Sequence, residues 1–192
     1  VLKQLGTKVW PACGYTRPVN AAIIYMRETH NIDPATVEEI EVRGGQGATR
    51  LLSEPAYEKA RPKISIDAKY SIPYTCSIAM LKGDVRLGDY LDDALQNPVN
   101  HDMGDKFRYV EDPEASAKSP MPIVTIRTNG NEYKHQVTSL PGDVNNPVSQ
   151  ERLRDKFRDA ASFSATPIAD SDIEEVVSLC ATLEILDDAT SI

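Results

Sequence analysis

Apolar residues recur at helical spacing near the start of the chain and then change to a spacing that suits a strand. Over residues 17–30 (RPVNAAIIYMRETH) the apolar positions follow roughly a helical period, and Pro18 lies in the first turn, where proline is tolerated. Over residues 37–45 the apolar positions Val37, Ile40 and Val42 suit a half-buried strand, and Gly44 and Gly45 mark its end. The pattern predicts a helix followed by a strand, with a strand end and a loop in the residues that precede the helix.

The stretch from Asp67 to Gly83, DAKYSIPYTCSIAMLKG, has two halves of different character. Its second half is apolar and stops at Gly83, which predicts a buried helix over residues 67–81. Its first half is polar and aromatic, although it lies where the buried helix begins. These side chains are either a polar collar that closes the end of a core helix or groups held over a pocket. They are Lys69, Tyr70, Ser71, Pro73 and Tyr74.

Strand-like alternation returns in the middle of the chain. Residues 84–106 carry turn residues and short helical pieces, and residues 107–138 then change to alternating apolar and polar positions. The dipeptide Asn129-Gly130 separates two alternating segments and is the strongest short-range signal for a hairpin. We therefore predict an antiparallel β-hairpin centred on this dipeptide.

The C-terminal residues return to a helical period. Residues 148–163 and 171–186 each place apolar side chains along one helical face, and Asp170 or Ser171 is a plausible cap of the second helix. Two amphipathic helices do not bury their apolar faces alone, so they need another body to pack against. The fold class we predict is α+β: a two-layer domain to about residue 142, followed by two amphipathic helices in residues 143–192.

The composition is that of a globular protein, and the charge narrows the choice of partner. The chain has 192 residues, of which 41% are hydrophobic and 26% charged. The net charge of −8 argues against broad binding to a phosphate backbone, so we expect no nucleic acid partner. No apolar run approaches the length that spans a bilayer, and no signal-peptide pattern is present, so we expect no membrane partner.

The cysteines and histidines show neither the spacing of a metal site nor that of a disulfide framework. We therefore expect no metal ligands, structural or solvated histidines, and a reducing intracellular compartment, cytoplasmic or mitochondrial. The chain starts at Val1 rather than at a methionine, which we interpret as a cut from a longer chain or a processed product. The residues concerned are Cys13, Cys76, Cys180, His30, His101 and His135.

Several motifs occur in an order that resembles a known family. They are KVWPACGYT, DAKYSIPYTCSIAMLKG, VRLGDY, NGNEYKHQV and PGDVNNPVSQERLRDKF. Together they resemble the C-terminal portion of the MmgE/PrpD family, which includes 2-methylcitrate dehydratases, cis-aconitate decarboxylases and iminodisuccinate epimerases. The resemblance runs over nearly the whole chain, and its most specific parts are the lysine-x-x-proline start and the DAKxSxPY segment.

The resemblance implies an architecture in which an all-helical domain precedes an α+β lid and the chain then returns to the helical domain. Residues 1–142 resemble the lid and residues 143–192 the returning helices, without the helical domain that precedes them. Part of the active site, including its catalytic histidines, would then come from that helical domain or from a partner chain. The family also implies a homo-oligomer.

The family's reactions remove or replace a proton beside a carboxylate of a small di- or tricarboxylic acid, without a metal or organic cofactor. Such chemistry needs cations that hold the carboxylates and stabilise enolate-like charge, and a general acid or base near the reacting carbon. We therefore expect the lid-bearing part of a cofactor-independent lyase, a dehydratase or decarboxylase. The alternatives are an epimerase or isomerase of the same family, or a non-catalytic lid or assembly subunit.

The resemblance assigns two residues to catalysis. Lys8 matches the lysine before the x-x-proline turn, a position that implies contact with a substrate carboxylate; the alternative is a solvated lysine. Tyr74 matches the tyrosine of the lid helix, which faces the cleft as a proton donor. The alternative is a core tyrosine, because Tyr74, Ile78 and Leu81 share one helical stripe.

Four further residues are expected to bind the substrate. Lys69 and Ser71 lie beside a helix start, where the dipole and free N–H groups attract anions. Cys13 and Arg17 belong to the loop CGYTRP, in which we expect Cys13 to be a packed residue rather than a nucleophile. Many family members carry a histidine after the threonine, where this chain has Arg17 or a deletion. Arginine grips a carboxylate but does not shuttle protons near neutral pH.

Overall fold

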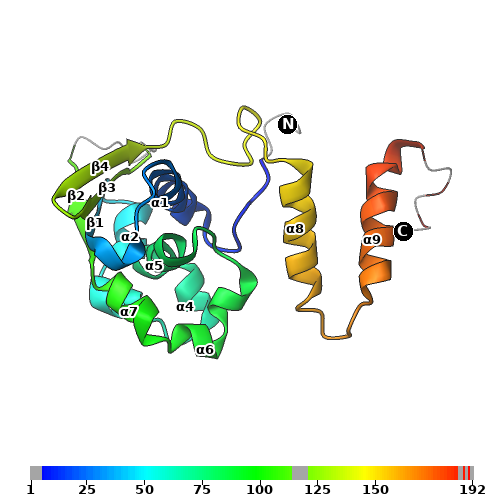
Figure 1. Ribbon diagram of the computed structural model, residues 1–192, viewed down its shortest axis with the longest axis horizontal. Coiled ribbons are helices and arrows are strands. Elements are labelled where there is room, and N and C mark those ends of the chain that lie inside the picture. Colours follow the sequence, from blue (N-terminus) through cyan, green and yellow to red (C-terminus); the bar gives the residue numbers. More distant parts are fainter. Residues whose placement is uncertain (1–5, 114–120, 186–187, 189, 191–192) are drawn as a thin grey trace. The chain divides into compact units, whose positions relative to one another are not determined.

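The protein, shown in Figure 1 as a computed structural model, divides into two compact units. The first comprises residues 1–147 and the second residues 148–192, and each is described by itself. Because the first unit combines a sheet with helices, the predicted α+β fold class is confirmed. The structure describes residues 6–113, 121–185, 188 and 190.

A four-stranded mixed sheet with the strand order β2-β1-β3-β4 forms one side of the first unit (Figure 1). Strand β1 pairs with β2 in parallel and with β3 antiparallel, and β3 and β4 form an antiparallel hairpin. This hairpin confirms the prediction, because Asn129 and Gly130 adopt the positive φ angles of 48° and 73° that suit a tight hairpin turn. The strands are β1 (Val37–Gly44), β2 (Phe107–Glu111), β3 (Ile123–Thr128) and β4 (Asn131–Gln136).

Helix α1 packs directly on the sheet, and further helices pack on α1 and on one another. Helix α1 contacts β3 and β4 and also contacts α5, so it connects the sheet to α5. The principal neighbours of α5 are the helices α7, α1, α3 and α2. The helices of this unit are α1 (Arg17–Thr29), α2 (Ala48–Ser53), α3 (Ala56–Ala60), α4 (Ser65–Lys69), α5 (Ile72–Lys82), α6 (Asp92–Leu95) and α7 (Pro98–Gly104), with the 3-10 turns η2 (Gly14–Thr16), η3 (Pro34–Thr36) and η4 (Leu87–Tyr90).

Helix α5 forms the centre of the core, because all residues from 72 to 80 are buried. The prediction of a single helix over residues 67–81 is wrong at its start, since α4 ends at Lys69 and α5 begins at Ile72. Ser71 lies between them with an extended backbone and accepts the N–H of Tyr74 at 3.0 Å, as an N-cap residue does. The predicted stop is confirmed, because Gly83 caps the helix with a φ of 72°.

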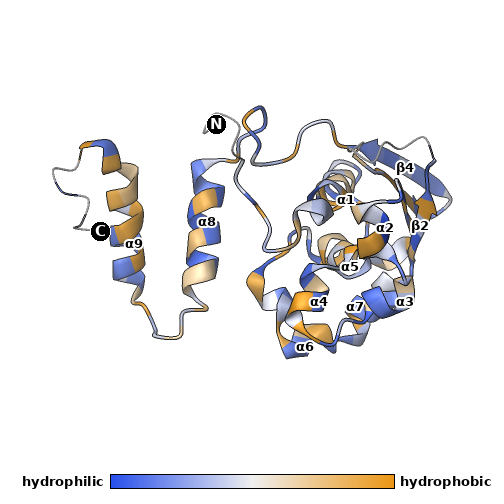
Figure 2. Ribbon diagram, turned by 180° about the vertical axis from the view of Figure 1, so that it is seen from behind, coloured by the Kyte–Doolittle hydropathy of each residue, from blue (hydrophilic) through white to orange (hydrophobic). Residues whose placement is uncertain are grey.

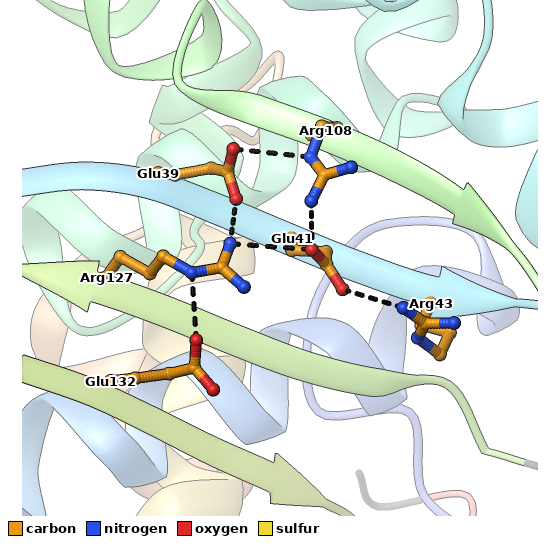
Figure 3. A network of polar contacts seen from close by, with 6 residues as sticks. All are labelled: Glu39, Glu41, Arg43, Arg108, Arg127 and Glu132. Carbon is orange, nitrogen blue, oxygen red and sulfur yellow. Dashed lines mark hydrogen bonds and ion pairs between the residues drawn. The ribbon is translucent and has the colours of Figure 1, made fainter.

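The two faces of the sheet differ in chemistry. Ile40 and Val42 of β1 are fully buried on one face, while Glu39 and Glu41 point to the other. Figure 3 shows that these two glutamates form ion pairs with arginines of the neighbouring strands. The cross-strand charges therefore satisfy one another and stabilise the register of the sheet. The network consists of Glu39, Glu41, Arg43, Arg108, Arg127 and Glu132.

Two aromatic stacks join α1 to the edge strand β4. Tyr25 stacks on His135 and His30 stacks on Tyr133, each pair with ring centroids 4.3 Å apart. Stacked rings add to the burial of apolar area. The histidines His30 and His135 thus act in packing.

The second unit is a helical hairpin of α8 (Gln150–Ala161) and α9 (Asp170–Ala181), followed by the 3-10 turn η5 (Leu183–Ile185). Arg158 joins the helices through two hydrogen bonds to the Glu174 carboxylate, of 2.7 and 3.0 Å. The predicted cap of α9 is wrong, because the N-cap residue is Ala169. Figure 2 shows hydrophobic and hydrophilic residues interspersed along both helices, and Phe157 remains 38% exposed.

A tight contact holds the N-terminal segment of the first unit. The N–H of Thr7 donates to the carbonyl of Gly142 at 2.7 Å, and the N–H of Gly142 donates to the carbonyl of Asn146 at 2.8 Å. Gly142 has a φ of 90°, and a Cβ atom built there would lie 2.0 Å from the Thr7 carbonyl oxygen. Only glycine therefore fits this position without a backbone shift.

We predict that Gly142→Ala lowers the free energy of unfolding by about 2 kcal/mol or more, because a positive φ and a backbone clash coincide. The matched control is Gly130→Ala, where φ is also positive, at 73°, but no atom lies within 4 Å of the new Cβ. That variant should cost only about 1 kcal/mol. Urea denaturation followed by circular dichroism measures both. Equal losses in the two variants would contradict the proposed close approach.

Candidate functional site

The break between α4 and α5 is held by one serine. The hydroxyl of Ser71 donates to the carbonyl of Lys59 at 2.5 Å and accepts the N–H of Tyr74 at 3.0 Å. The ammonium of Lys59 donates to the carbonyl of Tyr70 at 3.2 Å. Ser71 is fully buried, so its hydroxyl is occupied by the backbone groups that fix the helix start.

The N-terminal loop meets this break through the backbone. The N–H of Cys13 donates to the carbonyl of Lys69 at 2.9 Å, and the hydroxyl of Thr16 donates to the carbonyl of Cys13 at 2.8 Å. Helix α1 begins at Arg17, directly after this turn. The structure thus brings the loop of Cys13 next to the end of α4 and the start of α5, both of which lie more than fifty residues later in the sequence.

Lys69 carries a positive charge that forms no ion pair with any carboxylate the structure describes. Its ammonium lies 5.3 Å from the ring centroid of Tyr90, within the range of a cation–π contact. Among residues 6–113 and 121–185, none forms an ion pair with Lys69, and the side chain is half-buried. An incompletely hydrated cation without a counter-ion is suited to bind an anion.

Beneath this lysine lies a cluster around the buried carboxylate of Asp89. The carboxylate pairs with the ammonium of Lys82 and accepts the N–H of Arg86 at 2.7 Å. Tyr74 is fully buried, and its hydroxyl donates to the backbone carbonyl of Asp89 at 2.6 Å. Burial, reinforced by the negative charge of Asp89, raises the pKa values of both Tyr74 and Tyr90. Both phenols therefore stay protonated at neutral pH.

Arg17 and Lys8 are associated with a different segment, the loop of residues 141–143. The guanidinium of Arg17 donates to the carbonyl of Pro141 at 2.8 Å and to the carboxylate of Asp143 at 3.1 Å. Lys8 is exposed and directly follows Thr7, whose N–H binds Gly142 of the same loop. The charge of Arg17 is already paired, in contrast to that of Lys69.

The family model of the MmgE/PrpD C-terminal domain matches residues 10–182. The chain belongs to the MmgE/PrpD family. The match covers most of the chain and concerns the C-terminal domain, as the motifs implied. No curated protein sequence gives a significant match to this chain.

In the structure of this MmgE/PrpD C-terminal domain, the predicted site residues lie in two places. The fold brings Cys13, Lys69 and Ser71 together, places Tyr74 in the core beside them, and joins Arg17 and the segment of Lys8 through the 141–143 loop. The sequence interpretation missed the surrounding residues, because they join the cluster through contacts between separate elements. These are Lys59, Lys82, Asp89 and Tyr90.

Two further observations on this MmgE/PrpD domain concern metal binding and the length of its helices. Within the described ranges, no three histidine, cysteine or acidic side chains are grouped as metal ligands would be. None of the described helices is both long and apolar enough to cross a membrane.

We predict that Tyr74→Phe changes how stability depends on pH. A raised pKa in the folded state means that the contribution of Tyr74 is fully present below the usual tyrosine pKa of about 10 and is lost as the pH rises above it. The variant should lose about 1 kcal/mol near pH 7 through its missing hydrogen bond, yet fall less steeply above pH ~10.

Urea denaturation between pH 7 and 11 measures this effect, with Tyr70→Phe as the control because Tyr70 is 49% exposed. An unchanged slope for Tyr74→Phe above pH ~10 would contradict the buried, protonated state of its phenol.

Proposed function

We propose that this chain is the lid-bearing part of a lyase of the MmgE/PrpD family that acts on a small di- or tricarboxylic acid. The observation that carries the proposal is the unbalanced ammonium of Lys69 at the break between α4 and α5, next to the loop of Cys13. An ammonium in this place has the charge that a substrate carboxylate requires. Lys8, which matches the family's lysine before the proline turn, supplies a second cation on the same N-terminal segment.

The proposed reaction transfers a proton beside a carboxylate of the substrate, with no metal or organic cofactor. Cations near that carboxylate lower the energy of the enolate-like charge that develops as the proton leaves. Tyr74 is proposed as the proton donor, a role that its raised pKa favours over that of a base. For this donation the hydroxyl must exchange the carbonyl of Asp89 for a substrate oxygen.

The remaining residues have supporting roles in this proposal. Ser71 fixes the helix start through its hydrogen bonds, and Cys13 fixes the adjoining loop through its backbone. Arg17 anchors the 141–143 loop near Lys8, and a substrate carboxylate would compete with Asp143 for its guanidinium. An arginine at this place holds charge without proton transfer, so the general base comes from the family's all-helical domain or a partner chain.

The partner of this chain is therefore proposed to be the all-helical domain of the same enzyme, in the same polypeptide or a second one, within a homo-oligomer. The amphipathic helices α8 and α9 favour this, since Phe157 of α8 and Ile168 of the loop between the helices are exposed. The second candidate, an epimerase, uses the same first proton removal. A non-catalytic lid is the third, and the pairing of Arg17 with Asp143 favours it.

We predict that Lys8→Ala and Tyr74→Phe each lower kcat/KM of the complete assembly by about 100-fold or more, because a carboxylate contact or a proton donor is lost. Turnover is measured by NMR on a panel of di- and tricarboxylic acids with the helical domain present. Lys63→Ala is the matched control, because Lys63 is an exposed lysine on the same unit.

Folding of each variant is checked by circular dichroism, so that a loss of turnover is not a loss of structure. Native mass spectrometry of the protein from its source establishes which helical domain or chain accompanies it. If turnover survives both substitutions, the assignment of Lys8 and Tyr74 is wrong. If no carboxylic acid is converted by the complete assembly, the non-catalytic lid replaces the lyase.

A further inference from the structure

Two lysines contact residues of the turn η4, and they differ in their partners. Lys82 pairs with the carboxylate of Asp89, which is itself 3% exposed. Lys69 has no such partner in the described part of the chain and instead lies over the ring of Tyr90. The charge of Lys82 is therefore compensated within the fold, whereas the charge of Lys69 is available to an anion.

The ring beneath Lys69 is held rigidly. Tyr90 is 3% exposed and is the last residue of the turn η4. The carboxylate of Asp89 fixes this turn by accepting the N–H of Arg86 at 2.7 Å. A lysine side chain is flexible, so a fixed aromatic face restricts where its ammonium can lie.

The ring of Tyr90 contacts Lys69, but its hydroxyl has no such contact. It is buried and has no hydrogen-bond partner in the described structure. A buried hydroxyl without a partner costs stability rather than adding to it. The fold therefore gains from the aromatic face of Tyr90 and gains nothing from a hydrogen bond of its hydroxyl.

We propose that Tyr90 is the positioning residue of a carboxylate subsite whose binding group is the ammonium of Lys69. The ring holds the ammonium at the break between α4 and α5, so that a carboxylate meets a cation already in place. The ligand class is a small di- or tricarboxylate, which rests on the proposed function. The roles of Lys69 and Tyr90 are separable by experiment, because one binds the anion and the other acts only through it.

NMR of the full chain tests the position of the ammonium directly. An aromatic face shields protons above it, so the ε-methylene protons of Lys69 should resonate upfield of those of other lysines and show cross-relaxation with the Tyr90 ring. Lys69→Arg identifies the signal. Tyr90→Phe should keep the shift, and Tyr90→Leu should abolish it. A Lys69 signal at the ordinary lysine position in the unaltered chain would overturn the proposal, whether or not Tyr90→Leu folds.

Titration with succinate and with citrate tests the subsite. Lys69→Gln should abolish binding of the carboxylate at this subsite. Tyr90→Leu should lower the affinity about five-fold, the size expected for a lost cation–π contact. Tyr90→Phe should bind like the unaltered chain, because it retains the ring. Tyr70→Leu is the matched control, since Tyr70 is adjacent to Lys69 but 49% exposed.

Two results would contradict the proposal of a carboxylate subsite at Lys69. One is binding that Lys69→Gln leaves unchanged, and the other is a response that sodium chloride of equal ionic strength reproduces. Undiminished binding in a folded Tyr90→Leu, or weakened binding in Tyr90→Phe, would overturn the positioning role of the ring. All these readouts are made without turnover, so they are independent of whether the complete assembly proves to be a lyase.

Discussion

The structure of the first unit depends on the two hydrogen bonds of the Ser71 hydroxyl. This hydroxyl accepts the N–H of Tyr74 and donates to the carbonyl of Lys59, so it fixes where α5 begins and joins that point to α3. An uncapped helix start inside the core would leave a buried N–H without a partner, at a cost of about 1–3 kcal/mol. With the cap in place, α5 enters the core with residues 72–80 buried, and Lys69 is left at the end of α4 rather than within α5.

The start of α5 at Ile72 also affects which charged side chains near it are paired. The chain has a net charge of −8, yet two of its acidic groups are paired with cations within the fold: Asp89 with Lys82, and Asp143 with Arg17. The ammonium of Lys69 forms no ion pair with the described residues and lies over the aromatic ring of Tyr90. A protein that is acidic overall therefore presents a local cation, and local charge rather than net charge decides whether a small anion binds.

Features encoded by neighbouring residues were predictable from the sequence. The hairpin at Asn129-Gly130, the helix after Arg17 and the stop at Gly83 each depend on the conformations that one or two residues allow. The break at Ser71 was missed because its polar residues fitted either a collar or groups over a pocket, and only the bond from the N–H of Tyr74 to Ser71 shows that this serine caps α5. The partners of Lys69 and Tyr74 were not predictable, because Tyr90 and Asp89 reach them through the packing of η4 against other elements.

We propose that this chain contributes to proton transfer beside a substrate carboxylate. The most direct measurement is exchange in deuterated water: the assembly with its helical domain is incubated with di- and tricarboxylic acids, and their C–H signals are followed by NMR. We expect that the assembly replaces a proton next to a carboxylate by deuterium or removes it with product formation, and that this chain alone does neither. An assembly that binds these acids while every C–H signal persists would contradict it.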